Sequence, residues 1–209
     1  MSGARIERLV TSGTFSLDGG TWEVDNNVWI VGDDAEVIVI DPAHDPAAVQ
    51  AAVGDRKTHS ILLTHGHDDH IRAARATADL LGAPLYLHPA DRMLWDAVYE
   101  EAPDAQIADG DVYLFAGVEL HAKHTPGHSP GSVSFVAPAL GAVFTGDTLF
   151  QGGPGATGRS YSSFETIIDS IRTTLLSLPA ETVVHTGHGD TTTIGAEAPH
   201  LQEWIDRGH

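Results

Sequence analysis

Short apolar runs rich in valine and isoleucine recur along the chain, and glycine, proline, asparagine or aspartate bounds most of them. β-branched and aromatic residues between such turn residues are typical of strands. The pattern predicts strands at residues 26–31, 36–41, 60–65, 83–89, 111–115, 118–122, 131–137, 141–147 and 181–187.

Segments with apolar residues at helical spacing lie between these strands. Asp45 and Gly54 are typical of the start and end of a helix, and Ser162 with Glu165 forms a capping-box pattern before the clearest helix, which Pro179 closes. The predicted helices are residues 45–54, 71–82, 90–100, 162–179 and 197–208. Strands and helices interleave in two runs, which indicates an α/β or α+β protein.

Composition narrows the class of protein. The chain has 209 residues, 42% of them hydrophobic, and no linker or low-complexity segment, so we expect a single domain spanning residues 1–209. The net charge is −18 and Lys57 and Lys123 are the lysines, which argues against nucleic-acid partners. There is no cysteine, so disulfides and thiolate metal sites are excluded. With no secretion signal or membrane-length apolar run, we expect a cytoplasmic protein without a membrane partner.

The stretch "THGHDDH", residues 64–70, concentrates metal-binding side chains directly after a predicted strand. His65 and His67 are two positions apart, so both can point the same way on an extended segment. Asp69 and His70 follow where a helix changes the direction of the chain, so they can face a second centre. Imidazole and carboxylate groups are the ligands that borderline divalent metals favour, which predicts a metal site here.

Three later glycine-rich loops carry further candidates, and glycine lets the backbone approach a metal closely. Because sites gather in loops at one edge of packed sheets, we expect these loops to meet the first one. The candidate ligands are His65, His67, Asp69, His70, His128, Asp147 and His188. Two dications roughly 3.5 Å apart repel by about 19 kcal/mol at an effective dielectric constant of about 20. A bridging anion is therefore required, and Asp147 is our choice for the protein bridge.

These motifs resemble those of the metallo-β-lactamase superfamily, and glyoxalase II-like hydrolases most closely. The first stretch fits the T-H-x-H-x-D-H signature, and "HTPGHSPGS", "GDTLF" and "GHGDTTTIGAE" are similar to the later motifs in the expected order. The resemblance implies His65, His67 and His128 at one metal, Asp69, His70 and His188 at the other, and Asp147 between them. It also implies a four-layer αββα sandwich, with two mixed sheets face to face and helices on the outer faces.

The implied activity is hydrolysis of a thioester or ester by a metal-bridging hydroxide, which exists near neutral pH because zinc lowers the pKa of bound water to about 7. Asp69 and Asp147 are the predicted catalytic residues, and Asp69 can orient the hydroxide and accept its proton. We expect two divalent ions, zinc first, with iron or manganese as alternatives. The expected partner is a small-molecule thioester or ester, and the expected state is a monomer or small homo-oligomer.

Other members of the superfamily are tested against single positions. True β-lactamases of this fold generally lack the bridging aspartate, and acyl-homoserine lactonases carry a tyrosine at the position of Phe150, although a lactonase or other small-ester hydrolase stays an alternative. A mononuclear-iron persulfide dioxygenase needs only His65, His128 and Asp147, which are all present, so this alternative also stays open. A metal-binding protein without catalysis is the third alternative.

The substrate contacts are predicted from the same resemblance. Phe150 follows the bridging aspartate, and Arg159 and Tyr161 are the counterparts of a basic and an aromatic residue in a loop that is longer here. Asp190 stands shortly after the last metal histidine, where the family has tyrosine. The basic C-terminal extension that contacts glutathione is largely missing, so the thiol carrier is left open. Asp41, His124 and His185 are candidates for supporting the metal ligands.

Overall fold

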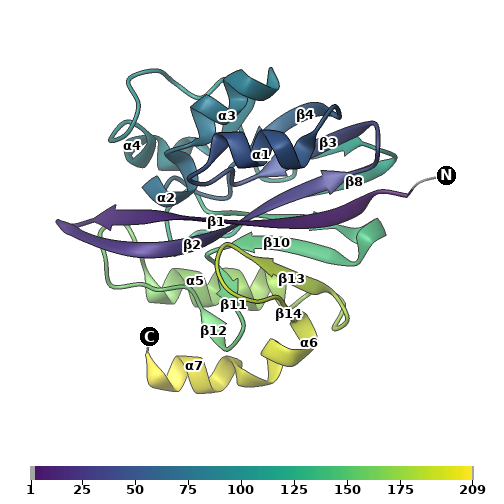
Figure 1. The fold of residues 1–209 in the computed structure, drawn as a ribbon. Helices are drawn as coiled ribbons and strands as arrows, with labels where there is room; N and C mark the ends of the chain where they lie inside the picture. The colour runs from purple at the N-terminus through teal and green to yellow at the C-terminus, as the bar shows by residue number, and fades with distance from the viewer. Residues whose placement is uncertain (1–2, 209) are drawn as a thin grey trace.

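The computed structural model describes residues 3–208 and has two six-stranded sheets packed face to face, with helices on both outer faces (Figure 1). This arrangement confirms the predicted αββα sandwich and its mixed sheets. Among the described residues, no helix is both long enough and apolar enough to cross a membrane.

The first sheet has the strand order β1-β2-β3-β4-β5-β6, antiparallel from β1 to β3 and parallel from β3 onward. Its strands are β1 (Arg5–Leu17), β2 (Gly20–Gly32), β3 (Glu36–Ile40), β4 (Lys57–Leu62), β5 (Leu85–Leu87) and β6 (Ala105–Gln106). The helical elements that accompany it are α1 (Pro46–Val53), α2 (Asp68–Ile71), α3 (Ala74–Leu81), the 3-10 turn Pro89–Asp91 and α4 (Arg92–Trp95). As predicted, Asp45 caps α1 by accepting the Ala48 amide, and Gly54 ends it with a positive φ.

The second sheet has the order β14-β13-β10-β9-β8-β7. Its strands are β7 (Val112–Phe115), β8 (Val118–His124), β9 (Val133–Ala137), β10 (Ala142–Gly146), β13 (Val183–Thr186) and β14 (Thr192–Thr193), while β11 (Leu149–Phe150) and β12 (Gly153–Pro154) form a separate ribbon. The remaining helical elements are the 3-10 turn Pro138–Leu140, α5 (Phe164–Ser170), the π-helical turn Ile171–Leu175, α6 (Ile194–Glu197), the 3-10 turn Ala198–His200 and α7 (Leu201–Arg207).

The main core lies between the two sheets. Trp29, Ile40 and Leu62 from the first sheet pack in one buried cluster with Phe135 and Phe144 from the second. Further apolar clusters fill the spaces under the helices on each outer face. This close apolar packing holds the two sheets in fixed positions relative to one another. The loops at the ends of their strands are therefore rigidly anchored.

The structure adds a strand that the sequence pattern does not predict. β1 pairs with β2 from Arg5 opposite Gly32 to Leu17 opposite Gly20, and the two form a long hairpin that crosses the molecule (Figure 1). Asp18 and Gly19 make its turn with positive φ values, as expected for a two-residue hairpin loop. The strand escapes prediction because its residues are mostly polar and only partly buried.

Helix boundaries also differ from the prediction. Ser163, not Ser162, caps α5, because its side chain accepts the Thr166 amide, while the Ser162 hydroxyl donates to the Arg159 carbonyl. The predicted helix 90–100 is reduced to a 3-10 turn and α4, and the helix predicted at 162–179 changes to π-helical geometry at Ile171.

Candidate metal centre

The first ligand-bearing loop leaves the end of β4 and turns into α2. His67 is the last extended residue before the helix, with φ −66° and ψ 145°, and Asp69 and His70 lie in the first helical turn. His65 and His67 therefore precede the change of direction, and Asp69 and His70 follow it. All four side chains are buried, so the loop presents two pairs of ligands to the interior.

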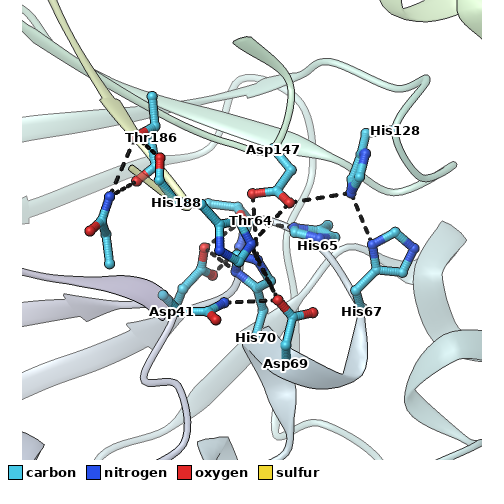
Figure 2. A network of polar contacts seen from close by, with 12 residues as sticks. Asp41, Thr64, His65, His67, Asp69, His70, His128, Asp147, Thr186 and His188 are labelled. Atoms are coloured by element: carbon cyan, nitrogen blue, oxygen red, sulfur yellow. Dashed lines mark hydrogen bonds and ion pairs between the residues drawn. The ribbon is translucent and has the colours of Figure 1, made fainter. Parts of the chain in front are cut away.

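The structure brings the predicted ligands together in two groups (Figure 2). His65, His67 and His128 form the first group, and in each group the ligand atoms lie within 4.8 Å of one another. Asp69, His70 and His188 form the second group. Segments far apart in the chain thus meet at one edge of the two sheets, as the sequence predicts.

Asp147 lies between the two groups. One carboxylate oxygen is 3.5 Å from His128 Nε2 and 3.3 Å from His188 Nε2, and the other is 3.5 Å from His70 Nε2. A single side chain thus faces histidines of both groups, which is the position that a bridging ligand requires.

The outer ring nitrogens of the histidines are held by hydrogen bonds. His128 Nδ1 donates to the Ala156 carbonyl at 2.9 Å, and His188 Nδ1 donates to the Asp25 carbonyl at 2.8 Å. His70 Nδ1 donates to Asp41, and His65 Nδ1 lies 3.0 Å from the Thr64 hydroxyl. These bonds orient each ring so that its Nε2 is directed inward, as in metal-binding histidines.

Unpartnered buried atoms test whether the residues fit metal ions. Among the described residues, His65 Nε2 and Asp147 Oδ1 are buried here without a hydrogen-bond partner. His67 Nδ1 and His128 Nε2 face each other at 2.9 Å in the same place. Leaving such groups unsatisfied costs about 1–3 kcal/mol each, so a fold that buries several in one place lacks a component there. Divalent cations coordinated by the inward-facing nitrogens and carboxylates would satisfy these unpartnered atoms. Imidazole and carboxylate donors are the ligands that borderline divalent metals favour.

The charge balance supports the same conclusion. Burial raises the pKa of Asp147, but the neighbouring His188 and His70 lower it well below its usual range. Burial likewise raises the pKa of Asp69, and His70, His188 and Asn26 lower it to about 2. Burial lowers the pKa of His67 to about 3 and that of His65 well below its usual range. Burial lowers the pKa of His188 and His70, but Asp147 and Asp69 raise that of His188 to about 10 and that of His70 well above its usual range. The buried carboxylates therefore attract positive charge, and a divalent cation would take the place of the protons on these two imidazoles.

A cavity of about 270 Å³ opens onto the centre, and two of the four predicted substrate contacts line it. Phe150 and Arg159 are on its wall, whereas Tyr161 is 56% exposed and lies outside the lining. Asp190 also lies outside the lining, and its carboxylate is 3.5 Å from the Arg8 guanidinium. Contacts of Tyr161 and Asp190 with substrate therefore stay predictions.

Other residues at the site have no counterpart in the prediction. Phe15 and Trp22 from the β1–β2 hairpin line the cavity, and the buried Asn26 donates to Asp69 at 2.9 Å. The asparagine pair at 26–27, directly before the apolar run 28–31, is the sequence signal for Asn26. Asp41 supports His70 as predicted, but His185 packs against Trp29 and Phe144 instead.

His124 has a different role from the one predicted. Its Nε2 lies 2.8 Å from the Pro130 carbonyl, so it holds the loop that carries His128 and makes no hydrogen bond to a ligand within residues 3–208. Backbone carbonyls orient His128 and His188 in place of the predicted histidines.

The chain is similar in sequence and in fold to known proteins. Residues 21–188 match the family model described as the metallo-beta-lactamase superfamily. The chain is 34% identical to the hydroxyacylglutathione hydrolase GloC of Haemophilus influenzae, over 79% of this chain and 85% of that protein. Its fold is similar to that of BLEG-1 B3 metallo-beta-lactamase, with a TM-score of 0.79, 29% identity and coverage of 91% and 98% of the two chains. It is also similar to TTHA1623, solved in a di-iron-bound form, with a TM-score of 0.76, 32% identity and coverage of 90% and 96%.

Proposed function

Because the chain belongs to the metallo-β-lactamase superfamily, we propose that it is a metal-dependent hydrolase that cleaves a small-molecule thioester or ester. The observation that carries this proposal is the position of Asp147 between two complete groups of metal-binding side chains. The similarity to a hydroxyacylglutathione hydrolase supports a thioester as the first choice. We place the activity in the cytoplasm.

Two divalent ions, zinc first with iron or manganese as alternatives, would be held by the two groups and Asp147. When bound, they supply Lewis acidity and a hydroxide nucleophile at neutral pH. The protein's contribution is to fix the donors in place and to exclude bulk water from a buried site. Asp69 faces the cavity, where its carboxylate can accept the proton of the attacking water, and Asn26 holds one of its oxygens.

The cavity wall limits the substrate that fits. Phe15, Trp22 and Phe150 give it an apolar surface suited to an acyl or thioether chain. Arg159 is the one arginine or lysine lining it within the described part of the chain, and its guanidinium stacks 4.0 Å from the Trp22 ring centre. Arg159 is therefore available to bind an anionic group of the substrate, while the aromatic rings contact the rest.

The test compares two reactions of the same metal-free protein after it has been loaded with zinc or with iron. Zinc-loaded protein should hydrolyse a hydroxyacyl thioester, with the activity lost in His128→Ala and kept in His121→Ala, because His121 lies on β8 outside both ligand groups. Oxygen uptake should be assayed in parallel with a persulfide and iron-loaded protein. Oxygen consumption without thioester or ester hydrolysis would favour the persulfide dioxygenase and overturn the proposal.

A further inference from the structure

Asp91 is a fully buried carboxylate next to the metal centre, and it belongs to neither ligand group. It ends the 3-10 turn Pro89–Asp91 after β5, and its amide donates to the His88 carbonyl at 3.1 Å. The buried Leu94 and Trp95 of α4 follow directly, so the backbone of Asp91 is anchored in the outer core.

The carboxylate of Asp91 accepts three hydrogen bonds from two different loops. One oxygen accepts from the Gly66 amide at 2.8 Å and from the Ser129 hydroxyl at 2.6 Å. The other oxygen accepts from the Gly131 amide at 2.5 Å. Hydrogen bonds to an ionised acceptor are roughly twice as strong as neutral ones, so this side chain joins the two loops firmly.

Both loops carry ligands of the first metal group. Gly66 is the residue between His65 and His67, and Ser129 directly follows His128. The bonds of Asp91 therefore reach all three histidines of that group through neighbouring backbone. Asp41 has the corresponding place for the second group, because it accepts from His70.

The glycines in these loops show how closely the backbone approaches Asp91. A Cβ atom at position 131 would lie 2.7 Å from the Asp91 backbone nitrogen and carboxyl carbon. One at position 66 would lie 3.0 Å from the Cβ atoms of Asp91 and Leu94. The distance at Gly131 is too short for a Cβ atom, and a Cβ atom at Gly66 would require its neighbours to move, so both loops pack closely against Asp91.

Burial of this carboxylate is costly. Burial raises the pKa of Asp91, and the hydrogen bonds from Ser129, Gly131 and Gly66 are the main contacts that offset its desolvation. An apolar side chain could fill the same space without that cost. The role of the carboxylate is therefore to join the two loops through its hydrogen bonds.

We propose that Asp91 is a positioning residue that sets the metal affinity of the His65–His67–His128 group and leaves the other group unaffected. This inference rests on the proposed metal centre and does not depend on the substrate. Removing a residue that orients metal ligands typically lowers metal affinity about 10- to 100-fold. Asp91→Asn keeps the shape of the side chain, but its amide group cannot accept from a backbone amide, so at least one loop loses its bond.

The experiment is a zinc titration of metal-free full-length protein against a chromophoric chelator, in backgrounds that leave one group complete. With His188→Ala, Asp91→Asn should lower the affinity of the remaining site about 10- to 100-fold. With His128→Ala, Asp91→Asn should leave the affinity of the remaining site unchanged. Unchanged affinity in the first background, or an equal loss in both, would overturn the inference.

Glu197→Gln is the matched control for a merely structural effect. Glu197 is also a buried carboxylate, and it accepts from the Gly152 amide at 2.9 Å and the Thr192 hydroxyl at 2.6 Å, outside the ligand loops. It should lower the melting temperature without changing zinc affinity in either background. If Asp91→Asn does not fold, Ser129→Ala, which removes one of the three bonds, should show a smaller loss confined to the first group. Wild-type affinity in Ser129→Ala would then contradict the proposal.

Discussion

His70 Nδ1 donates to Asp41 Oδ2 at 3.0 Å, and both side chains are almost completely buried. The same carboxylate accepts the Thr64 amide at 2.7 Å and the Thr64 hydroxyl at 2.6 Å. Asp41 itself has a φ of 49°, a conformation that residues with a side chain seldom adopt. A strained backbone conformation persists only where neighbouring contacts stabilise it. Here the strained residue Asp41 places its carboxylate at the end of β3, next to the ligand loop that follows β4.

Asp41→Asn should weaken metal binding because the amide cannot accept all the donors that face the carboxylate. We expect about a 10- to 100-fold loss of zinc affinity, measured by chelator competition on metal-free protein. Asp33→Asn is the control, because Asp33 also accepts two backbone amides, from Ala35 and Glu36, in the turn at the opposite end of β3 from Asp41. Equal zinc affinity in the two variants would show that Asp41 does not orient His70.

Asp147→Ala should reduce both metal content and hydrolysis. The side chain faces His70, His128 and His188, so its loss removes a carboxylate that contacts histidines of both groups. We expect a rate lower by about 100-fold or more, which corresponds to about 3 kcal/mol of lost transition-state stabilisation. Elemental analysis and initial rates measure the two effects. Near wild-type values for both would remove the bridge assignment.

Arg159→Ala should raise KM for an anionic substrate about 10-fold, with a smaller effect on kcat, because the residue binds substrate away from the reacting atoms. A neutral ester of similar size should show little change. Arg172→Ala is the control, since Arg172 pairs with Asp169 on the surface and lies outside the cavity. Equal changes for anionic and neutral substrates would contradict a role in charge recognition.

His185 should make stability depend on pH. Burial lowers its pKa from 6.5 to about 4, so between these values the unfolded chain binds a proton that the folded protein does not. Stability is therefore full above pH 6.5 and falls as the pH drops toward 4, by up to about 1.4 kcal/mol per pH unit from this group. His185→Phe, which suits packing against Phe144 and Trp29, should reduce that slope in urea unfolding of the metal-free protein. An unchanged slope would show that His185 is not the group involved.

The ligand set is predictable from the sequence because each ligand stands in a short motif at a strand end. His65, His67, Asp69 and His70 are neighbours in the chain. Asp147 and His188 each follow an apolar strand, and His128 stands in a loop with glycine directly before it. The sandwich is predicted by the family resemblance of these motifs. The apolar runs of its central strands are compatible with that fold but do not establish its layers by themselves.

The supporting contacts are harder to predict because they depend on residues that meet only in the folded protein. Asp91 appears in the sequence as one acidic residue in a predicted helix, and its three partners lie 25 to 40 positions away. Phe15 and Trp22 reach the cavity through a hairpin whose first strand is mostly polar. The Asp18–Gly19 turn is the signal that could have revealed this hairpin.

The proposed hydrolase requires a pair of cations held by two groups of side chains that share Asp147. Elemental analysis of the purified protein, calibrated by amino-acid analysis, counts these cations. We expect about two divalent ions per chain, falling to about one in His188→Ala. A single iron per chain, unchanged by His188→Ala, would contradict the two-metal centre and the hydrolase built on it.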